Sequence, residues 1–141
     1  MRLQDIMHRS VETISPNDSV VLANELMWRK SIHHLVVMND GAVVGVLSDK
    51  DLGGDAAQEL PDNQRVVDVM SAHTVVGDPQ MTVDRALHIF QERHMHCLPV
   101  MDQGKLVGIV TGTDIMSLAK RGAPNKNGSG PYPPLQGLQQ I

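Results

Sequence analysis

The chain contains the stretch HHLVVMNDGAVVGVLSDKDL at positions 33–52, and a related stretch, HCLPVMDQGKLVGIVTGTDI, follows at positions 96–115. The same offset of 63 residues continues toward the N-terminus without a gap, so that residues 3–52 align with residues 66–115. Of these 50 pairs 13 are identical, and many others exchange one aliphatic side chain for another. A gapless match of this length predicts two copies of one structural unit, neither of which buries its apolar residues well alone.

The duplication also predicts how the chain is organised. The first copy, with its linker, takes residues 1–62, and the second takes residues 63–120. Beyond Arg121 the sequence is rich in Gly, Pro, Asn and Ser and has almost no apolar periodicity. Such a composition buries too little apolar surface to order itself. We therefore expect residues 121–141 to form a flexible tail.

Each copy follows a β-α-β-β-α pattern. Ser19 and Thr82 precede apolar residues at helical spacing and are candidate N-caps. Two apolar segments then flank a turn that contains glycine, which favours a hairpin because glycine adopts positive φ readily. We predict a mixed α/β (α+β) fold in which two such repeats pack sheet to sheet about a pseudo-two-fold axis. The positions expected to form the buried helix faces are Val20, Ala23, Leu26, Met27, Val83, Ala86, Leu87 and Phe90.

Composition excludes several classes of function. The net charge is −4, aromatic residues make up 2% of the chain and there is no long basic run, so nucleic-acid binding is not expected. No apolar run approaches the ~20 residues of a membrane helix, and the start lacks the apolar stretch of a secretory signal. The single cysteine, Cys97, excludes an internal disulfide and fits a reducing compartment. We expect a cytoplasmic protein that binds no membrane.

Catalysis is not expected either. The sequence contains no nucleophile elbow, no phosphate-binding P-loop and no HExxH metal motif. We therefore predict that the chain is not an enzyme.

Both copies end in a Gly-x-x-Ser/Thr-x-x-Asp motif, with Ser48 and Asp51 in the first and Thr111 and Asp114 in the second. One interpretation is a capping box, in which the hydroxyl and the carboxylate satisfy backbone N–H groups at a helix start. The other is a ribose-phosphate site, because helix starts attract phosphate and a carboxylate can accept hydrogen bonds from ribose hydroxyls. The strand glycines Gly45 and Gly108 are then expected to let a ligand approach the backbone.

The order, spacing and duplication of these motifs resemble a pair of cystathionine-β-synthase-type (CBS) domains, or Bateman module, over about residues 3–119. The resemblance is carried by a short lead before each copy, by an apolar segment and by the final motif. The first and second leads are Leu3–Met7 and Val66–Met70, and the apolar segments are Ile32–Met38 and Met95–Met101.

The resemblance implies a stand-alone regulatory module that senses a ligand. It implies binding of AMP, ADP, ATP or S-adenosylmethionine in clefts between the repeats, with AMP expected and no obligatory cofactor. It also implies a homodimer that signals by a conformational or oligomeric change to a separate regulated protein.

The family's binding residues carry over onto matching positions. The resemblance implies that Asp51 and Asp114 hold the ribose, and that Ser48 and Thr111 contact the ribose or the phosphate. The positions that would flank the adenine are Thr13, Ile14, Val75 and Val76, and those at the phosphate are His33, His34 and His96.

Four positions depart from the family pattern. Histidine replaces the usual arginine at His33 and His96, Val36 replaces proline, and Cys97 replaces histidine. Histidine lacks the permanent charge and the fixed set of N–H donors of an arginine guanidinium. Its presence therefore weakens polyphosphate binding and makes binding sensitive to pH, which favours AMP over ATP.

Two other functions stay open on the sequence. The side chains of His33, His34, His94, His96 and Cys97 could form a metal sensor, although their spacing matches no fixed zinc pattern. Alternatively, the clefts are empty and the module serves only as a dimerisation scaffold.

Overall fold

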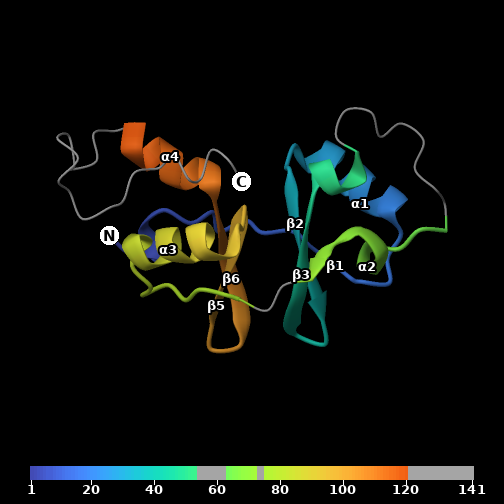
Figure 1. Ribbon diagram of the computed structural model, residues 1–141. Helices are drawn as coiled ribbons and strands as arrows, with labels where there is room; N and C mark the ends of the chain where they lie inside the picture. The colour runs from blue at the N-terminus through green and yellow to red at the C-terminus, as the bar shows by residue number, and fades with distance from the viewer. Residues whose placement is uncertain (54–62, 73–74, 121–141) are drawn as a thin grey trace. The chain divides into compact units, whose positions relative to one another are not determined.

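The computed structural model describes residues 1–53, 63–72 and 75–120, and the chain folds as two compact units (Figure 1). The first-copy unit comprises Val11–Thr74 and so holds the helix and hairpin of the first repeat. The second-copy unit combines Met1–Ser10 with the chain from Val75 onward. The mixed α+β class predicted from the sequence is confirmed by the helices and strands of both units.

The first-copy unit is built on a four-stranded sheet in the order β1-β2-β3-β4. Strand β1 runs parallel to β2, whereas β2–β3 and β3–β4 are antiparallel pairs. The elements of this unit are β1 (Thr13–Ile14), α1 (Val20–Lys30), β2 (His34–Asn39), β3 (Ala42–Ser48), the 3-10 helix η2 (Asp49–Leu52), α2 (Val66–Val69) and β4 (Ser71–Ala72).

The second-copy unit repeats this plan with a smaller sheet. Its antiparallel hairpin pairs β5 with β6, and Gly77 makes an isolated parallel bridge to Val100 where the first copy has β1. The elements are the 3-10 helix η1 (Leu3–Asp5), α3 (Val83–Arg93), β5 (Cys97–Asp102), β6 (Lys105–Thr111) and α4 (Gly112–Lys120). None of the described helices has the length and apolarity that crossing a membrane requires.

Local signals in the sequence predict the helix starts and the turns. Ser19 Oγ accepts a hydrogen bond from Leu22 N at 3.1 Å, and Thr82 Oγ1 accepts one from Arg85 N at 3.1 Å, so both predicted N-caps are confirmed. Both hairpin turns place two consecutive residues at positive φ, as a type I′ turn requires. These residues are Asp40 (φ 52°) and Gly41 (φ 82°), then Gln103 (φ 51°) and Gly104 (φ 81°).

Each unit has its own hydrophobic core. All four predicted positions of α3 are buried, and of the four in α1 only Leu26 is partly exposed. The core of the second-copy unit includes Leu3, Met7, Val83, Ala86, Leu87, Phe90, Leu98, Val100, Val110 and Ile115. The core of the first-copy unit includes Ile14, Val20, Ala23, Met27, Leu35, Val37, Leu47, Leu52 and Val66.

The two leads are exchanged between the copies. Leu3 N donates to Met81 O at 2.8 Å, and Val66 N donates to Asp18 O at 2.9 Å. Each bond maps onto the other through the offset of 63, so the exchange is reciprocal. Two further pairs of hydrogen bonds repeat in the same way. Val83 N donates to Met1 O as Val20 N donates to Gln64 O, and Gln4 N donates to Pro79 O as Val67 N donates to Pro16 O. Each lead therefore completes the core of the copy that it does not precede.

Candidate functional site

The two final motifs lie where a strand passes into a helix. Ser48 N donates to Asp51 Oδ2 at 2.8 Å, and Asp51 N donates back to Ser48 Oγ at 3.3 Å. In the second copy Thr111 N donates to Asp114 Oδ2 at 2.7 Å, and Asp114 N donates to Thr111 Oγ1 at 3.4 Å. The capping-box interpretation is therefore confirmed in both copies. In each copy the cap uses one carboxylate oxygen, Oδ2.

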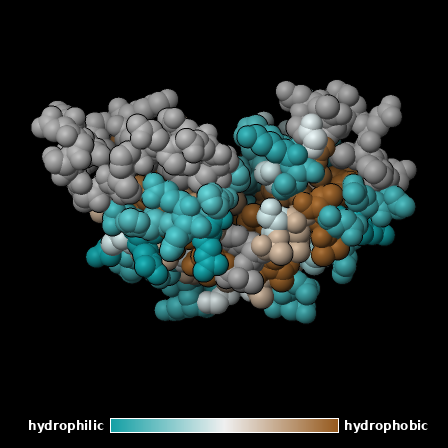
Figure 2. Space-filling model, in the orientation of Figure 1, coloured by the Kyte–Doolittle hydropathy of each residue, from teal (hydrophilic) through white to brown (hydrophobic). Residues whose placement is uncertain are grey.

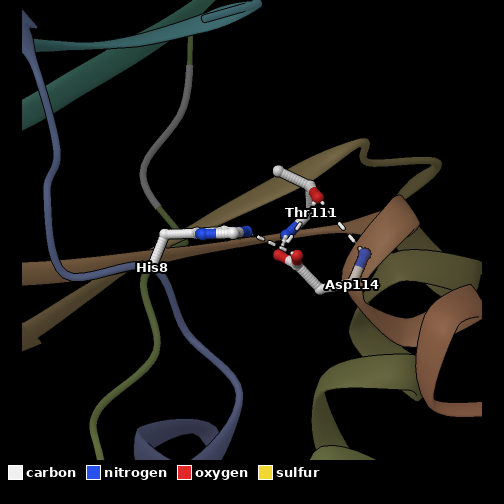
Figure 3. A network of polar contacts seen from close by, with 3 residues as sticks. All are labelled: His8, Thr111 and Asp114. Carbon is white, nitrogen blue, oxygen red and sulfur yellow. Dashed lines mark hydrogen bonds and ion pairs between the residues drawn. The ribbon is translucent and has the colours of Figure 1, made fainter.

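The second carboxylate oxygen distinguishes the two copies. Asp51 is exposed, and its Oδ1 has no hydrogen-bond partner among the residues that the structure describes. Asp114 is only 12% exposed, and its Oδ1 lies 2.7 Å from His8 Nε2 (Figure 3). Because a carboxylate oxygen accepts, the imidazole N–H donates this hydrogen bond. The two carboxylates thus form the same cap, but Asp114 Oδ1 is already bonded to His8, whereas Asp51 Oδ1 has no partner among the described residues.

The structure corrects the expectation that Gly45 and Gly108 make room for a ligand. A Cβ at Gly45 would lie 2.7 Å from both Met70 Sδ and Ser71 O, and a Cβ at Gly108 would lie 2.5 Å from Met7 Sδ. The atoms that approach these glycines belong to the exchanged leads and, for Gly45, also to Ser71, which follows the second lead. The reason for glycine here is therefore the packing of a lead against β3 or β6.

The four predicted adenine positions differ in exposure. Thr13 is exposed on β1, whereas Ile14 is 6% exposed and belongs to the core of the first-copy unit. Val75 and Val76 are half-buried, and Val75 packs against the core of the second-copy unit. The side chain of Ile14 is therefore part of the core of its unit.

The predicted phosphate positions are unequal as well. The His33 side chain is 76% exposed, and its Nδ1 lies 2.9 Å from Asp49 Oδ2 in an ion pair when the imidazole is protonated. The equivalent of Asp49 in the second copy is Gly112, so His96, which is exposed, has no acidic residue at that position. His34 is half-buried at the start of β2. The first copy therefore places a carboxylate beside its predicted phosphate position.

The geometry of the described part of the chain does not support the alternative of a metal sensor. There, no group of three or more His, Cys, Asp or Glu side chains could hold a metal ion. Cys97 is 2% exposed, and His94 ends α3 in the left-handed conformation at φ 54°.

Sequence reasoning missed His8. The repeat aligns His8 with Ser71, which shares no chemistry with it, and neither residue lies in a motif. His8 reaches Asp114 because the exchanged first lead runs beside β6, where His8 N donates to Ile109 O at 2.9 Å and Ile109 N donates to His8 O at 3.0 Å. Only the pairing of the lead with the other copy could have revealed the contact.

Comparison with known proteins agrees with this architecture. Residues 3–52 and 66–121 match the family model described as CBS domain. The CBS domain-containing protein YhcV of Bacillus subtilis is 32% identical over 114 residues, which is 80% of this chain and 81% of YhcV.

Solved structures show the same fold. The structure of CBSX2 in complex with AMP is 26% identical, with a TM-score of 0.69 over 85% of this chain and 97% of that chain. The CBS domain pair of protein MJ0100, in complex with 5′-methylthioadenosine and S-adenosyl-L-methionine, is 23% identical, with a TM-score of 0.75 over 87% and 98%. With both copies matched by the family model, the chain belongs to the CBS-domain family.

Proposed function

We propose that this CBS pair is a regulatory sensor of an adenosine ligand, with AMP as the preferred ligand. Asp51 and Asp114 hold the ribose, and Ser48 and Thr111 lie beside them at the ribose or phosphate. The adenine lies against Thr13, Ile14, Val75 and Val76, and His33, His34 and His96 stand near the phosphate. The protein acts in the cytoplasm without catalysis, as a homodimer that signals to a separate regulated protein.

The observation that carries the proposal is the Asp51 carboxylate. Asp51 is an exposed residue whose Oδ2 already accepts the Ser48 N–H, while Oδ1 has no partner among the described residues. A carboxylate has about four lone-pair sites, so Asp51 can accept hydrogen bonds from a ribose diol and still cap its helix. The similar structure of CBSX2 holds AMP, which supports an adenosine ligand of this size.

The charges beside the phosphate position favour a monophosphate. Asp49 Oδ2 lies 2.9 Å from His33 Nδ1 and adds a negative charge where a polyphosphate chain would extend. Histidine also lacks the permanent charge and the fixed fork of donors that arginine would bring. A triphosphate loses more from both effects than a monophosphate does, because it carries about twice the charge.

The exposed apolar side chains support a dimer. Figure 2 shows hydrophobic surface on the first-copy unit, in the right half of the view. The large apolar side chains exposed in this unit include Val21, Leu22 and Trp28 of α1 and Val67 of α2, and Trp28 is 79% exposed. Burial of such a surface against a second copy is a direct route to an oligomeric signal.

The test is isothermal titration calorimetry of AMP, ADP, ATP and S-adenosylmethionine with wild type and with the double variant Asp51→Ala, Asp114→Ala. We expect AMP to bind wild type and the double variant to lose binding. Asp68→Ala is the matched control, because Asp68 Oδ2 caps α2 through Arg65 N at 2.9 Å without lying in a final motif. Undiminished AMP binding by a folded double variant would show that the ribose assignment is wrong.

A further inference from the structure

The second candidate site contains a residue that the first lacks. Asp114 Oδ2 accepts hydrogen bonds from Thr111 N at 2.7 Å and Thr111 Oγ1 at 3.1 Å, and Oδ1 accepts from His8 Nε2 at 2.7 Å. Figure 3 shows the His8 ring and Thr111 both facing the Asp114 carboxylate, which lies between the first lead and the end of β6. We propose that His8 competes with the ribose for Asp114, so that the ligand occupies the Asp51 site more tightly than the Asp114 site. This inference rests on the proposed function.

The backbone of His8 is fixed by hydrogen bonds to β6, whereas its ring is largely exposed to solvent. Two backbone hydrogen bonds to Ile109 and the burial of the preceding Met7 (9% exposed) hold the chain at this point. The side chain of His8 is nevertheless 64% exposed. The ring can therefore turn away from Asp114 by side-chain rotation alone, and an arriving ribose displaces a hydrogen bond rather than the whole lead.

The first copy supplies the reference state. Ser71 pairs with Val46 as His8 pairs with Ile109, so the two residues occupy equivalent backbone positions beside β3 and β6. The two positions differ in the side chain: within the described residues Ser71 makes no hydrogen bond to Asp51, which is exposed. Exchange of serine and histidine at these two positions should therefore exchange the properties of the two sites.

The competition has a definite size. A ligand that enters the Asp114 site must break a hydrogen bond between partly exposed groups, and such bonds contribute modestly to net stability. Removal of the His8 side chain should therefore raise affinity at this site by about 2- to 12-fold.

The experiment uses calorimetry with AMP in the full chain carrying Asp51→Ala, which leaves Asp114 as the remaining ribose carboxylate. We expect the added change His8→Ser to tighten binding by about 2- to 12-fold. His8→Gln, which can still donate to Asp114 from its amide, should tighten binding less. The mirror variant Ser71→His in an Asp114→Ala background should weaken binding at Asp51, and thermal midpoints without ligand verify that each variant is folded.

The outcomes separate the two proposals. Weaker or unchanged AMP binding on His8→Ser, with the Asp51→Ala protein folded and binding AMP, would overturn the competition and leave the proposed function standing. Absence of AMP binding in wild type and in His8→Ser alike would overturn the proposed function and this inference together. AMP binding that appears only on His8→Ser would support both.

Discussion

Replacement of Leu3 by alanine tests the exchange of the leads. Leu3 is fully buried (0% exposed) in the core of the second-copy unit, together with Phe90 and Leu87. Removal of three buried carbon atoms costs about 2.4 kcal/mol in transfer free energy. The cavity that remains raises the loss to about 3–5 kcal/mol.

The location of the loss is the informative part. Native-state hydrogen exchange should show reduced protection in α3 and in the β5–β6 hairpin, because Leu3 belongs to the core that these elements form. Val66→Ala is the mirror variant: Val66 is fully buried in the first-copy core, so amides of α1 and β2 should lose protection instead. Gln4→Ala, at an exposed position of the same lead, serves as the control for Leu3. Loss of protection in α1 with α3 unchanged in the Leu3→Ala protein would refute the exchange.

Three other changes test further features. Gly108→Ala should lower the thermal midpoint by several degrees, because its Cβ would lie 2.5 Å from Met7 Sδ. Gly112→Ala is the control, because its Cβ would meet only His96 O at 4.0 Å. Equal midpoints of the two variants would contradict the close packing at Gly108. His94→Gly should raise the free energy of unfolding, measured in urea, by up to about 1 kcal/mol. His94 ends α3 at φ 54°, and glycine adopts this conformation without strain. A clear loss of stability would instead reveal a contact of the imidazole. Asp49→Asn should raise the affinity for ATP relative to AMP in calorimetric titrations, since it removes the negative charge 2.9 Å from His33, and an unchanged ratio would place the phosphates elsewhere.

Much of the fold is predictable because its signals are local. Ser19 and Thr82 cap their helices from the adjacent position, and the glycines of the two hairpin turns take the positive φ that the turns require. The capping boxes of the two final motifs each span only four residues. Each of these features depends on neighbouring residues, so the sequence pattern contains the whole cause.

The features that sequence reasoning missed depend on distant segments. An offset of 63 residues is the same whether a lead packs against its own copy or the other, so the repeat contains no information on the exchange. The roles of Gly45 and Gly108 and the contact of His8 with Asp114 follow from that exchange and were missed with it. Among the described residues, Asp49–Leu52 form the 3-10 helix η2, whereas the equivalent residues of the second copy begin α4.

The reciprocal leads have a consequence for how such a chain can be divided. A fragment with one copy and the lead that precedes it carries an apolar segment such as Leu3–Met7 without the surface that buries it. The core of the same fragment lacks the lead of the other copy. Two such fragments can satisfy each other by trading segments, which is domain swapping. In the full chain the same exchange is intramolecular, because both copies and both leads lie on one polypeptide.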